Sequence, residues 1–478
     1  MNFKLVFRIT GLTLLLGSAT LVLPLIVALL YREDPTPFLK TILLMLVAGV
    51  LLSLLRPKSG FFAREGFFAV ALIWVLFGLF GALPFWFSGE FGSYVNCVFE
   101  TVSGFTTTGS SILTAVEGVS YGLLFWRSFT HWLGGMGVLI LTIALLPKLG
   151  INSVYLIQAE SPGPITSKLV PKASQSSKIL YAIYLALTLI EIAALRLTGM
   201  PWFDSIVNSM ATAGTGGFSI KNLSIGAYGN PAAEVIITIF MLLFSVNFAL
   251  YFLILRKKWR QALKSDELRF FGGVVAAAIV LITLNILPLY NEIATSLRLA
   301  AFQVASVIST TGFATANFDL WPEFSRMILV VLMFIGACAG STGGGVKCAR
   351  MVVLFKSLFR EIRKIIHPRS VNVVKLEGAV VEESTLRTIH AFFFAYMCTL
   401  FGACLIVGLD DFSFGTTFTA VLTCLSNVGP GLEMVGPMGN FSAFSDLSKV
   451  VLSLCMIIGR LEIFPILVLF SSDAWKRS

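Results

Sequence analysis

Thr107-Thr108-Gly109 is the first of four similar segments that decide the fold of this chain. The other three are Thr215-Gly216-Gly217, Thr310-Thr311-Gly312 and Asn427-Val428-Gly429. A polar residue always stands two positions before the final glycine, and a small residue stands six positions before it. The small residues are Ser103, Ala211, Ser306 and Thr423. Each segment lies between two long apolar stretches, so the sequence predicts four repeats of a span, a short helix, a glycine loop and a second span.

The composition places these repeats in a membrane. Of the 478 residues, 56% are hydrophobic and only 13% are charged. Soluble domains contain about 25% charged residues, so this chain lacks the polar surface to face water on all sides. The 7 Cys and 3 His form neither a Cys-x-x-Cys nor a His-x-x-x-His motif, which argues against a zinc site or a disulfide framework. We predict an all-α polytopic membrane protein.

Ten apolar stretches are long enough to cross a bilayer, since about 20 helical residues span roughly 30 Å of hydrocarbon. They are 8–30, 38–55, 67–88, 123–147, 179–199, 233–255, 270–290, 326–358, 389–408 and 447–471. The first two form an N-terminal helix pair, and the other eight supply two spans to each repeat. The predicted units are the pair 1–60 and the repeats 61–150, 175–262, 266–369 and 380–478.

The net charge of +10 has an ordinary explanation in a membrane protein. Most of the 35 Lys and Arg fall at the two ends of the chain and in alternate connections, including 148–178, 256–269 and 350–387. Cytoplasmic loops are enriched in these residues, so we predict that both termini are cytoplasmic and that nucleic acid is not a partner. The basic segments 256–260 and 360–364 have the same explanation, together with contact to anionic membrane lipid.

The glycine loops have the properties of a cation site. Irregular backbone at membrane depth is tolerated only where it is buried in protein or lines a watery path, and four loops meet this condition by converging on one axis. A short helix entering from outside points its partly negative C-terminal end at the membrane centre. Glycine permits positive φ, which lets successive carbonyls turn inward and replace the hydration shell of an ion. One such loop alone is better explained by helix packing, but four in register favour the cation site.

With these four loops and two additional N-terminal spans, the chain resembles the Trk/Ktr/HKT superfamily of potassium-translocating proteins, and within it the TrkH branch. The resemblance covers essentially the whole chain. It implies channel-like, selective uptake of K⁺ and Rb⁺ through a pseudo-fourfold pore, driven by the membrane potential. It also implies a homodimer in the bacterial cytoplasmic (inner) membrane and cytoplasmic nucleotide-binding regulatory subunits of the TrkA type. No cofactor is expected besides the transported K⁺.

The resemblance assigns a K⁺ selectivity filter, whose backbone carbonyls would hold the ion, to the four loops. Its residues are Thr107, Thr108, Gly109, Thr215, Gly216, Gly217, Thr310, Thr311, Gly312, Asn427, Val428 and Gly429. In plant relatives a Ser in place of the first filter glycine goes with Na⁺ selectivity, so Gly109 fits the K⁺-selective pattern. The fourth loop departs from the pattern because Asn427 and Val428 replace the Thr pair.

The eighth apolar stretch contains a run of glycines that predicts a break. Consecutive glycines cost about 1 kcal/mol each inside a helix. The run lacks the final Gly-Lys-Ser/Thr of a phosphate-binding loop and lies inside an apolar span. In the family the matching segment is an intramembrane loop beneath the filter that acts as a gate. The gate residues implied here are Gly340, Ser341, Thr342, Gly343, Gly344, Gly345 and Lys347, together with Arg460.

Arg460 stands near the middle of the tenth stretch, where a charge costs at least about 2.5–3.5 kcal/mol. It should therefore face a wet cavity or a partner. Glu462 does not share its helical face and is a poor candidate partner. The resemblance implies that Arg460 points into the pore and opposes cations, while the alternative is a structural pairing within the bundle. For His131 we predict a packing role.

Two other classes of function compete with the pore. An ion-coupled secondary transporter, such as a K⁺/H⁺ or K⁺/Na⁺ symporter, needs carboxylates inside the membrane. Glu191 and Glu462 are well inside spans and Glu100 lies in a short helix, so such machinery is thin. A less selective Na⁺/K⁺ pathway also fits the divergent fourth loop. A membrane enzyme would need clustered His, Asp or Ser, which the sequence does not show.

Overall fold

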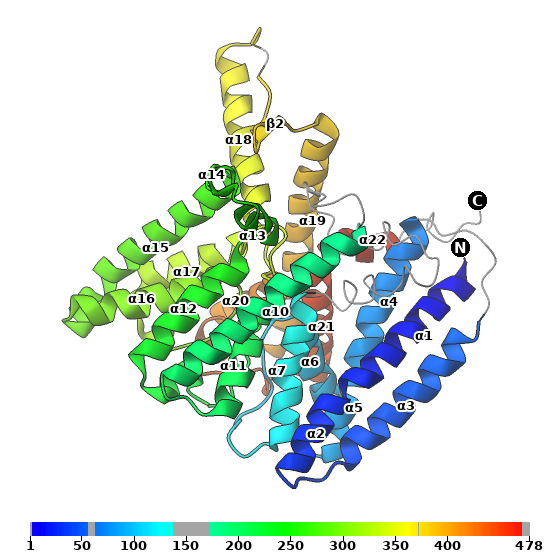
Figure 1. Ribbon diagram of the computed structural model, residues 1–478. Helices are drawn as coiled ribbons and strands as arrows, with labels where there is room; N and C mark the ends of the chain where they lie inside the picture. The colour runs from blue at the N-terminus through cyan, green and yellow to red at the C-terminus, as the bar shows by residue number, and fades with distance from the viewer. Residues whose placement is uncertain (1, 56–62, 137–172, 371, 471–478) are drawn as a thin grey trace.

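The computed structural model describes residues 2–55, 63–136, 173–370 and 372–470, and almost all of its regular structure is helical (Figure 1). The chain begins with α1 (Phe3–Thr20), α2 (Val22–Leu30) and α3 (Thr36–Ser53). Helices α1 and α3 lie side by side in close contact at Gly11 and Gly49. A Cβ atom on Gly11 would come within 2.8 Å of the Gly49 carbonyl oxygen, so small residues permit this approach.

The remaining helices follow in four groups, each containing one short helix that precedes a glycine loop. The first group is α4 (Ala63–Gly81), α5 (Leu83–Ser88), α6 (Tyr94–Phe105) and α7 (Tyr121–Gly135). The second is α10 (Ala173–Leu197), α11 (Trp202–Gly214), α12 (Pro231–Ser245), α13 (Phe248–Leu255) and α14 (Trp259–Ala262). The third is α15 (Asp266–Tyr290), α16 (Ile293–Ile308), α17 (Glu323–Ile335) and α18 (Cys348–Ile366). The fourth is α19 (Glu383–Val407), α20 (Phe414–Ser426), α21 (Asp446–Arg460) and α22 (Phe464–Phe470).

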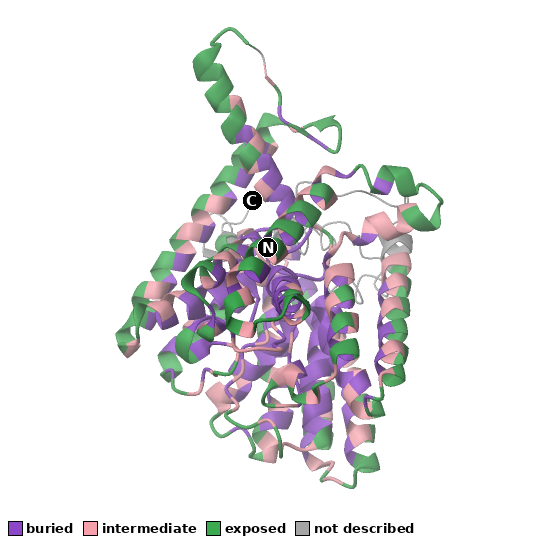
Figure 2. Cartoon of the chain, turned by 90° about the vertical axis from the view of Figure 1, so that its left-hand side faces the viewer, coloured by how far each residue is buried: buried purple, intermediate pink, exposed green. Residues whose placement is uncertain are grey.

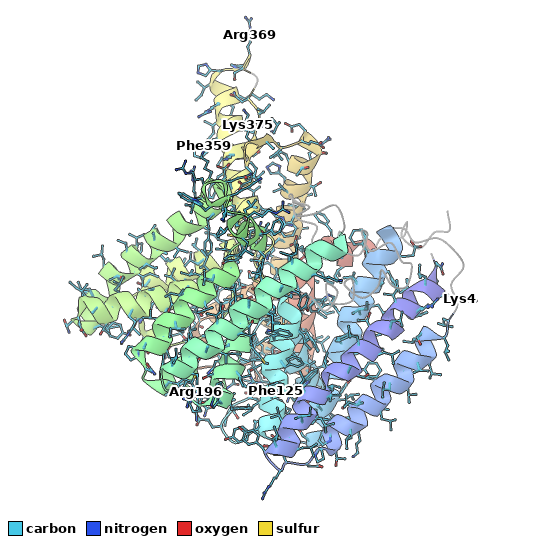
Figure 3. All side chains as sticks on the ribbon, viewed as in Figure 1. Lys4, Phe125, Arg196, Phe359, Arg369 and Lys375 are labelled. Atoms are coloured by element: carbon cyan, nitrogen blue, oxygen red, sulfur yellow. The ribbon has the colours of Figure 1, made fainter. Side chains whose placement is uncertain are left out.

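Short elements complete the connections. They are the 3₁₀ turns η2 (Ser224–Tyr228), η3 (Phe318–Leu320), η4 (Gly408–Asp410) and η5 (Glu433–Val435). Strands β1 (Lys375–Leu376) and β2 (Ala379–Val380) pair as an antiparallel hairpin between α18 and α19. Figure 3 places Phe359, Arg369 and Lys375 at the end of the molecule where α18 projects, and Arg196 at the opposite end.

Helix length and composition confirm a multi-span membrane protein. In the described ranges, six helices or joined helices are long and apolar enough to cross a membrane, or seven if the bent pair α12–α13 is one span. Buried residues gather in the middle of the bundle, and exposed ones follow the outer helices (Figure 2). The second part of the predicted span 123–147 and most of the predicted loop 148–178 lie outside the described residues.

Within the described ranges, three of the predicted spans are interrupted by two or more non-helical residues. The eighth is broken between Ile335 and Cys348, where its glycine run lies. The prediction of a single span over 233–255 is wrong in detail, because α12 and α13 meet at 93°. Asn247 begins α13 by accepting a hydrogen bond from the Ala249 N–H, which provides the cap for a new helix. The tenth span is likewise interrupted after Arg460.

Candidate functional site

The four glycine loops begin where helices α6, α11, α16 and α20 end, and they share one backbone hydrogen bond. In each loop the N–H just before the final glycine donates to the carbonyl of the small residue near the helix end, at 2.9 Å. The pairs are Thr108 with Ser103, Gly216 with Ala211, Thr311 with Ser306, and Val428 with Thr423. The equivalence seen in the sequence therefore extends to the backbone of all four loops.

The loops also repeat an unusual backbone conformation. The polar residue two before the glycine has φ between 55° and 60° in every copy, and these residues are Thr107, Thr215, Thr310 and Asn427. The final glycines have φ between 74° and 101°. Left-handed φ is rare for a β-branched residue and costs about 1–3 kcal/mol, and such strain concentrates at functional sites. Three threonines held this way make the four loops a candidate functional site.

Contacts between neighbouring loops close a ring. A Cβ atom on Gly109 would lie 2.0 Å from the Gly216 carbonyl oxygen, and one on Gly217 would lie 1.9 Å from that of Thr311. The same approach is 2.3 Å from Gly312 to Val428 and 2.6 Å from Gly429 back to Thr108. Each final glycine thus lies against the carbonyl that precedes the glycine of the next loop, and the order runs from the first loop to the fourth and back. No other residue fits these positions without displacing backbone.

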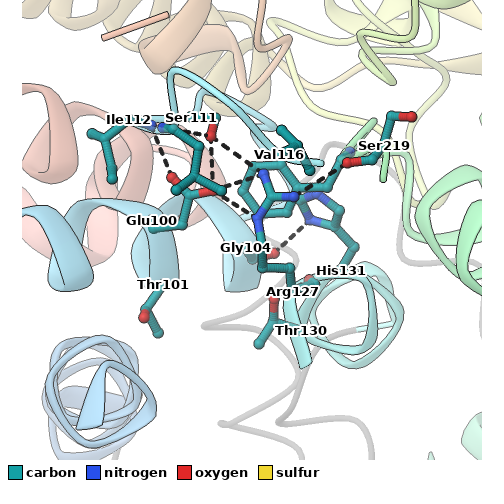
Figure 4. Close-up of polar contacts among 12 residues, drawn as sticks. Glu100, Thr101, Gly104, Ser111, Ile112, Val116, Arg127, Thr130, His131 and Ser219 are labelled. Atoms are coloured by element: carbon teal, nitrogen blue, oxygen red, sulfur yellow. Dashed lines mark hydrogen bonds and ion pairs between the residues drawn. The ribbon is translucent and has the colours of Figure 1, made fainter. Parts of the chain in front are cut away.

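A buried ion pair lies behind the first two loops (Figure 4). Oε1 of Glu100 lies 2.7 Å from Nη2 of Arg127, and both side chains are almost fully buried. Oε2 of Glu100 accepts a hydrogen bond from the Ile112 N–H at 2.9 Å, while Nη1 of Arg127 donates to the Ser219 carbonyl at 3.2 Å. The guanidinium also lies over the Phe218 ring, 4.0 Å from its centre. The pair ties the outer part of the first loop to that of the second.

His131 makes a second bridge between the same two loops. Its Nδ1 lies 2.8 Å from the Gly104 carbonyl oxygen, and its Nε2 lies 3.2 Å from the Phe218 N–H (Figure 4). A carbonyl only accepts and an N–H only donates, so the proton is on Nδ1 and the imidazole is neutral. This is the packing role predicted for His131. The sequence reading missed Arg127, although an arginine inside an apolar stretch was a signal for a buried partner.

The glycine-rich loop 336–347 lies against the third and fourth glycine loops. The Gly344 N–H donates to Oγ1 of Thr310 at 2.7 Å. A Cβ atom on Gly344 would lie 2.4 Å from the Ser426 carbonyl oxygen, and one on Gly343 would lie 2.8 Å from that of Ser309. Glycine is therefore required at both positions for the 336–347 loop to approach the ring.

The 336–347 loop is also bound to the bend between α12 and α13. The Cys338 N–H donates to the Ser245 carbonyl at 3.0 Å, and the Phe248 N–H donates to the Gly340 carbonyl at 3.0 Å. Oγ1 of Thr342 donates to the Phe244 carbonyl at 3.1 Å. The bend frees backbone groups of α12 and α13 that the 336–347 loop then satisfies. Sequence reasoning missed this docking, although Ser245 and the helix-capping Asn247 interrupt the apolar run at the bend.

Arg460 joins three elements through hydrogen bonds. Its Nη1 donates to Oγ1 of Thr107 at 3.2 Å and to the Thr342 carbonyl at 2.9 Å. Its Nη2 donates to the carbonyls of Gly134 and Gly135 at the end of α7, at 2.5 and 2.9 Å. The structure thus brings together one residue of the first glycine loop, one of the 336–347 loop and the arginine predicted to accompany them.

The other charges near this loop have their own partners. Glu462 forms an ion pair with Arg350, in keeping with its poor placement for Arg460. Lys347 is buried, and its Nζ donates to the Gly343 carbonyl within the same loop. Among the described residues no three His, Cys, Asp or Glu side chains come together as a metal site.

The fold and the ring define a multi-span membrane transport protein with a backbone-built site above a broken span. A family model named TrkH and described as a cation transport protein matches residues 35–477, and the chain belongs to this family. It is 38% identical over 487 residues to the Trk system potassium uptake protein TrkH of Salmonella typhimurium, with 100% of each chain covered. It is 33% identical to the Trk system potassium uptake protein TrkG of Escherichia coli, with 99% of each covered.

A solved structure shows the same fold. The crystal structure of the potassium transporter TrkH from Vibrio parahaemolyticus matches with a TM-score of 0.89 at 33% identity, covering 100% of both chains. The relatives are named as uptake proteins and transporters. The family is therefore one of transporters and not of enzymes.

Proposed function

We propose that this chain forms a channel-like pathway for selective uptake of K⁺ and Rb⁺ across the bacterial cytoplasmic membrane, driven by the membrane potential. The closed ring of four glycine loops carries the proposal. Carbonyl oxygens of the loops replace the hydration shell of K⁺, and the C-terminal ends of four short helices add partial negative charge. An inward-moving cation gains about 2.3 kcal/mol per 100 mV, so no cofactor or ATP chemistry is needed.

The gate in this proposal is the segment 340–347 with Arg460, below the filter. Its support is geometric, because Gly344 and Arg460 each contact a residue of the ring. A guanidinium beneath the filter raises the barrier to a cation, and movement of the loop opens the path. These gate residues lie within the glycine-rich loop 336–347, which is called the gate loop below.

Orientation and assembly belong to the same proposal. Both termini and the projecting end of α18 face the cytoplasm, as the basic segments 256–260 and 360–364 favour. The four repeats 61–150, 175–262, 266–369 and 380–478 surround the pore in pseudo-fourfold order. The chain forms a homodimer and works with cytoplasmic nucleotide-binding regulatory subunits. The names of its relatives, which place them in a Trk system, support the existence of further components.

Ion flux into liposomes tests the pathway. The purified chain is reconstituted, a K⁺ gradient is imposed, and entry of Rb⁺, K⁺ and Na⁺ is followed directly. We expect K⁺ and Rb⁺ to enter and Na⁺ to enter much more slowly. Absence of K⁺ and Rb⁺ entry, or equal entry of Na⁺, would reject the selective pore.

Glu191 favours a second candidate, a symporter that couples K⁺ to H⁺. This α10 side chain is fully buried, and neither carboxylate oxygen makes a well-formed hydrogen bond to another described residue, although Thr212 lies beside it. Ionisable residues inside a membrane often carry coupling protons. Flux driven by a proton gradient in the wild type, and lost in Glu191→Gln, would support the symporter over the passive pore.

A further inference from the structure

Glu267, near the start of α15, is a buried carboxylate that binds both the gate loop and the start of α18. It is 5% exposed. Its Oε1 accepts a hydrogen bond from the Ala339 N–H at 2.6 Å and another from the Ala349 N–H at 2.9 Å. Ala339 directly precedes Gly340, and Ala349 is the second residue of α18. A single oxygen atom therefore joins the segment before the gate residues to the helix after them.

These two N–H groups suit an anion. The first N–H groups of a helix have no partner within the helix, and Ala349 supplies one of them. The partial positive charge of the helix start and the short distances make both bonds charge-assisted. Without the carboxylate, two buried donors would lose their acceptor. The ends of the gate loop would then be joined by backbone bonds such as those from the Lys347 N–H to the Ile335 carbonyl and from the Cys348 N–H to the Ala337 carbonyl.

The backbone N–H of Glu267 contacts the β1–β2 hairpin. Glu377 and Gly378 form its two-residue turn, both with positive φ. Oε1 of Glu377 accepts a hydrogen bond from Oγ of Ser265 at 2.7 Å and one from the Glu267 N–H at 3.4 Å. The hairpin turn thus holds the first residues of α15, including the residue that holds the gate loop.

A parallel contact fixes the hairpin to α18. Nζ of Lys356 lies 2.7 Å from Asp266 Oδ2 and donates to the Lys375 carbonyl at 2.9 Å. Lys356 of α18 therefore links the hairpin to the start of α15. Lys375 is labelled in Figure 3 at the projecting end of the molecule, where a partner can reach it.

We propose that Glu267 is a positioning residue that keeps the gate loop closed, and that the hairpin 375–380 sets its position through Glu377 and Ser265. This inference rests on the proposed function, since it takes residues 340–347 as the gate. A force that shifts the hairpin moves the start of α15 relative to the gate loop, separates Glu267 from Ala339 and Ala349, and so loosens the gate loop where it meets α18.

The contact of Glu267 with Ala339 and Ala349 is called the latch below. Two buried cysteines next to it provide a readout that does not depend on transport. Cys338 adjoins Ala339, Cys348 adjoins Ala349, and both are at most 1% exposed. The full chain in liposomes is treated with a maleimide, labelling of each cysteine is measured by peptide mass spectrometry, and Rb⁺ influx is measured on the same preparation.

Removal of the carboxylate should loosen the gate loop. In Glu267→Ala we expect both cysteines to react about tenfold faster and Rb⁺ influx to rise, since hydrogen bonds to a charged group are lost. Glu267→Gln keeps an acceptor oxygen and should change both readouts less. Glu377→Gln and Ser265→Ala should shift them in the same direction. The matched control is Glu361→Gln, an exposed carboxylate on α18, which should leave both unchanged.

The outcomes separate the latch from the pore. Wild-type reactivity and influx in Glu267→Ala overturn the latch, and faster labelling with lower influx overturns its closing role. If the wild type carries no Rb⁺, the proposed function is rejected. If the wild type carries Rb⁺ but cysteine labelling is unchanged in Glu267→Ala, only the latch is rejected. If Glu267→Ala does not reach the membrane, Glu267→Gln and Glu377→Gln carry the same comparison, and wild-type behaviour of both overturns the proposal.

Discussion

Glu100 and Arg127 form an ion pair that fixes the outer parts of two glycine loops from behind. Glu100 holds the backbone of Ile112 in the first loop, and Arg127 holds that of Ser219 in the second. Charges buried this deeply contribute little net stability, but removing one partner leaves the other uncompensated. The pair therefore sets the geometry of two sides of the ring.

Arg127→Met should be strongly destabilising, because it leaves the Glu100 carboxylate buried without its partner. We expect a loss of about 3–5 kcal/mol in the free energy of unfolding, seen as a lower thermal midpoint in detergent. The double variant Glu100→Gln with Arg127→Met removes both charges and should recover much of the loss. Arg196→Met, at an exposed position on α10, is the control. A midpoint for Arg127→Met equal to that of the wild type would contradict the role of the pair.

Gly312→Ser should weaken discrimination between K⁺ and Na⁺. A Cβ atom at this position would lie 2.3 Å from the Val428 carbonyl oxygen, and φ is +86°, so the third and fourth loops must move apart. Displaced carbonyls no longer coordinate K⁺ closely, so K⁺ loses its advantage over Na⁺. The ratio of Rb⁺ to Na⁺ influx in liposomes measures this change. Gly402→Ala, where a Cβ meets open space, is the control, and an unchanged ratio in Gly312→Ser would count against the filter assignment.

Several features of the fold and site are predictable because they follow from local chemistry. The four glycine loops are visible as a repeat, and the glycine run alone explains why α17 and α18 are separate helices. The fourth loop retains the shared conformation although it departs from the Thr pattern. Asn427 adopts left-handed φ, which asparagine tolerates well, and its Nδ2 donates to Oγ1 of Thr108 and to the Met456 carbonyl.

Other features depend on contacts between distant residues and have no local signature. The bend at Val246–Asn247 is stabilised by Gly340, far along the chain, so Asn247 signals a helix start but neither the angle of the bend nor its partner. Arg460 binds mainly backbone carbonyls among its described contacts, and carbonyls occur at every position. Glu267 likewise binds two backbone N–H groups. Periodicity and composition therefore locate the loops but not the groups that hold them.

Glu433 should make the outer end of the fourth repeat sensitive to acid. Hydrogen bonds from the Ser413 hydroxyl and from Thr416, at the start of α20, lower the pKa of Glu433 below its usual 4.5. The folded protein then binds a proton less readily than the unfolded chain, so the stabilisation is present above pH 4.5 and is lost as the pH falls through the lower folded pKa.

Thermal unfolding at a series of pH values tests this sign. At neutral pH, Glu433→Gln should unfold at a lower temperature than the wild type, and the difference should shrink as the pH falls below 4.5. Glu323→Gln, an exposed carboxylate at the start of α17, should follow the wild-type profile. A difference that grows in acid would show that the shift has the opposite direction.

Arg460→Ala should raise K⁺ flux, because it removes a positive charge and the hydrogen bonds that join Thr107 to Thr342. Lowering the barrier by about 1.4 kcal/mol raises the rate about tenfold. Arg460→Lys keeps the charge but loses the forked hydrogen bonds. Low flux in this variant would assign the barrier to charge, and high flux would assign it to the anchoring of the gate loop.

Deletion of residues 343–345 should raise flux by removing the part of the gate loop that lies against Ser309 and Ser426. Rb⁺ influx into liposomes, corrected for the amount of reconstituted protein, measures all three variants. Unchanged or lower influx in both Arg460→Ala and the deletion would show that these residues do not obstruct the ion, and the gate would have to be sought elsewhere in the pathway.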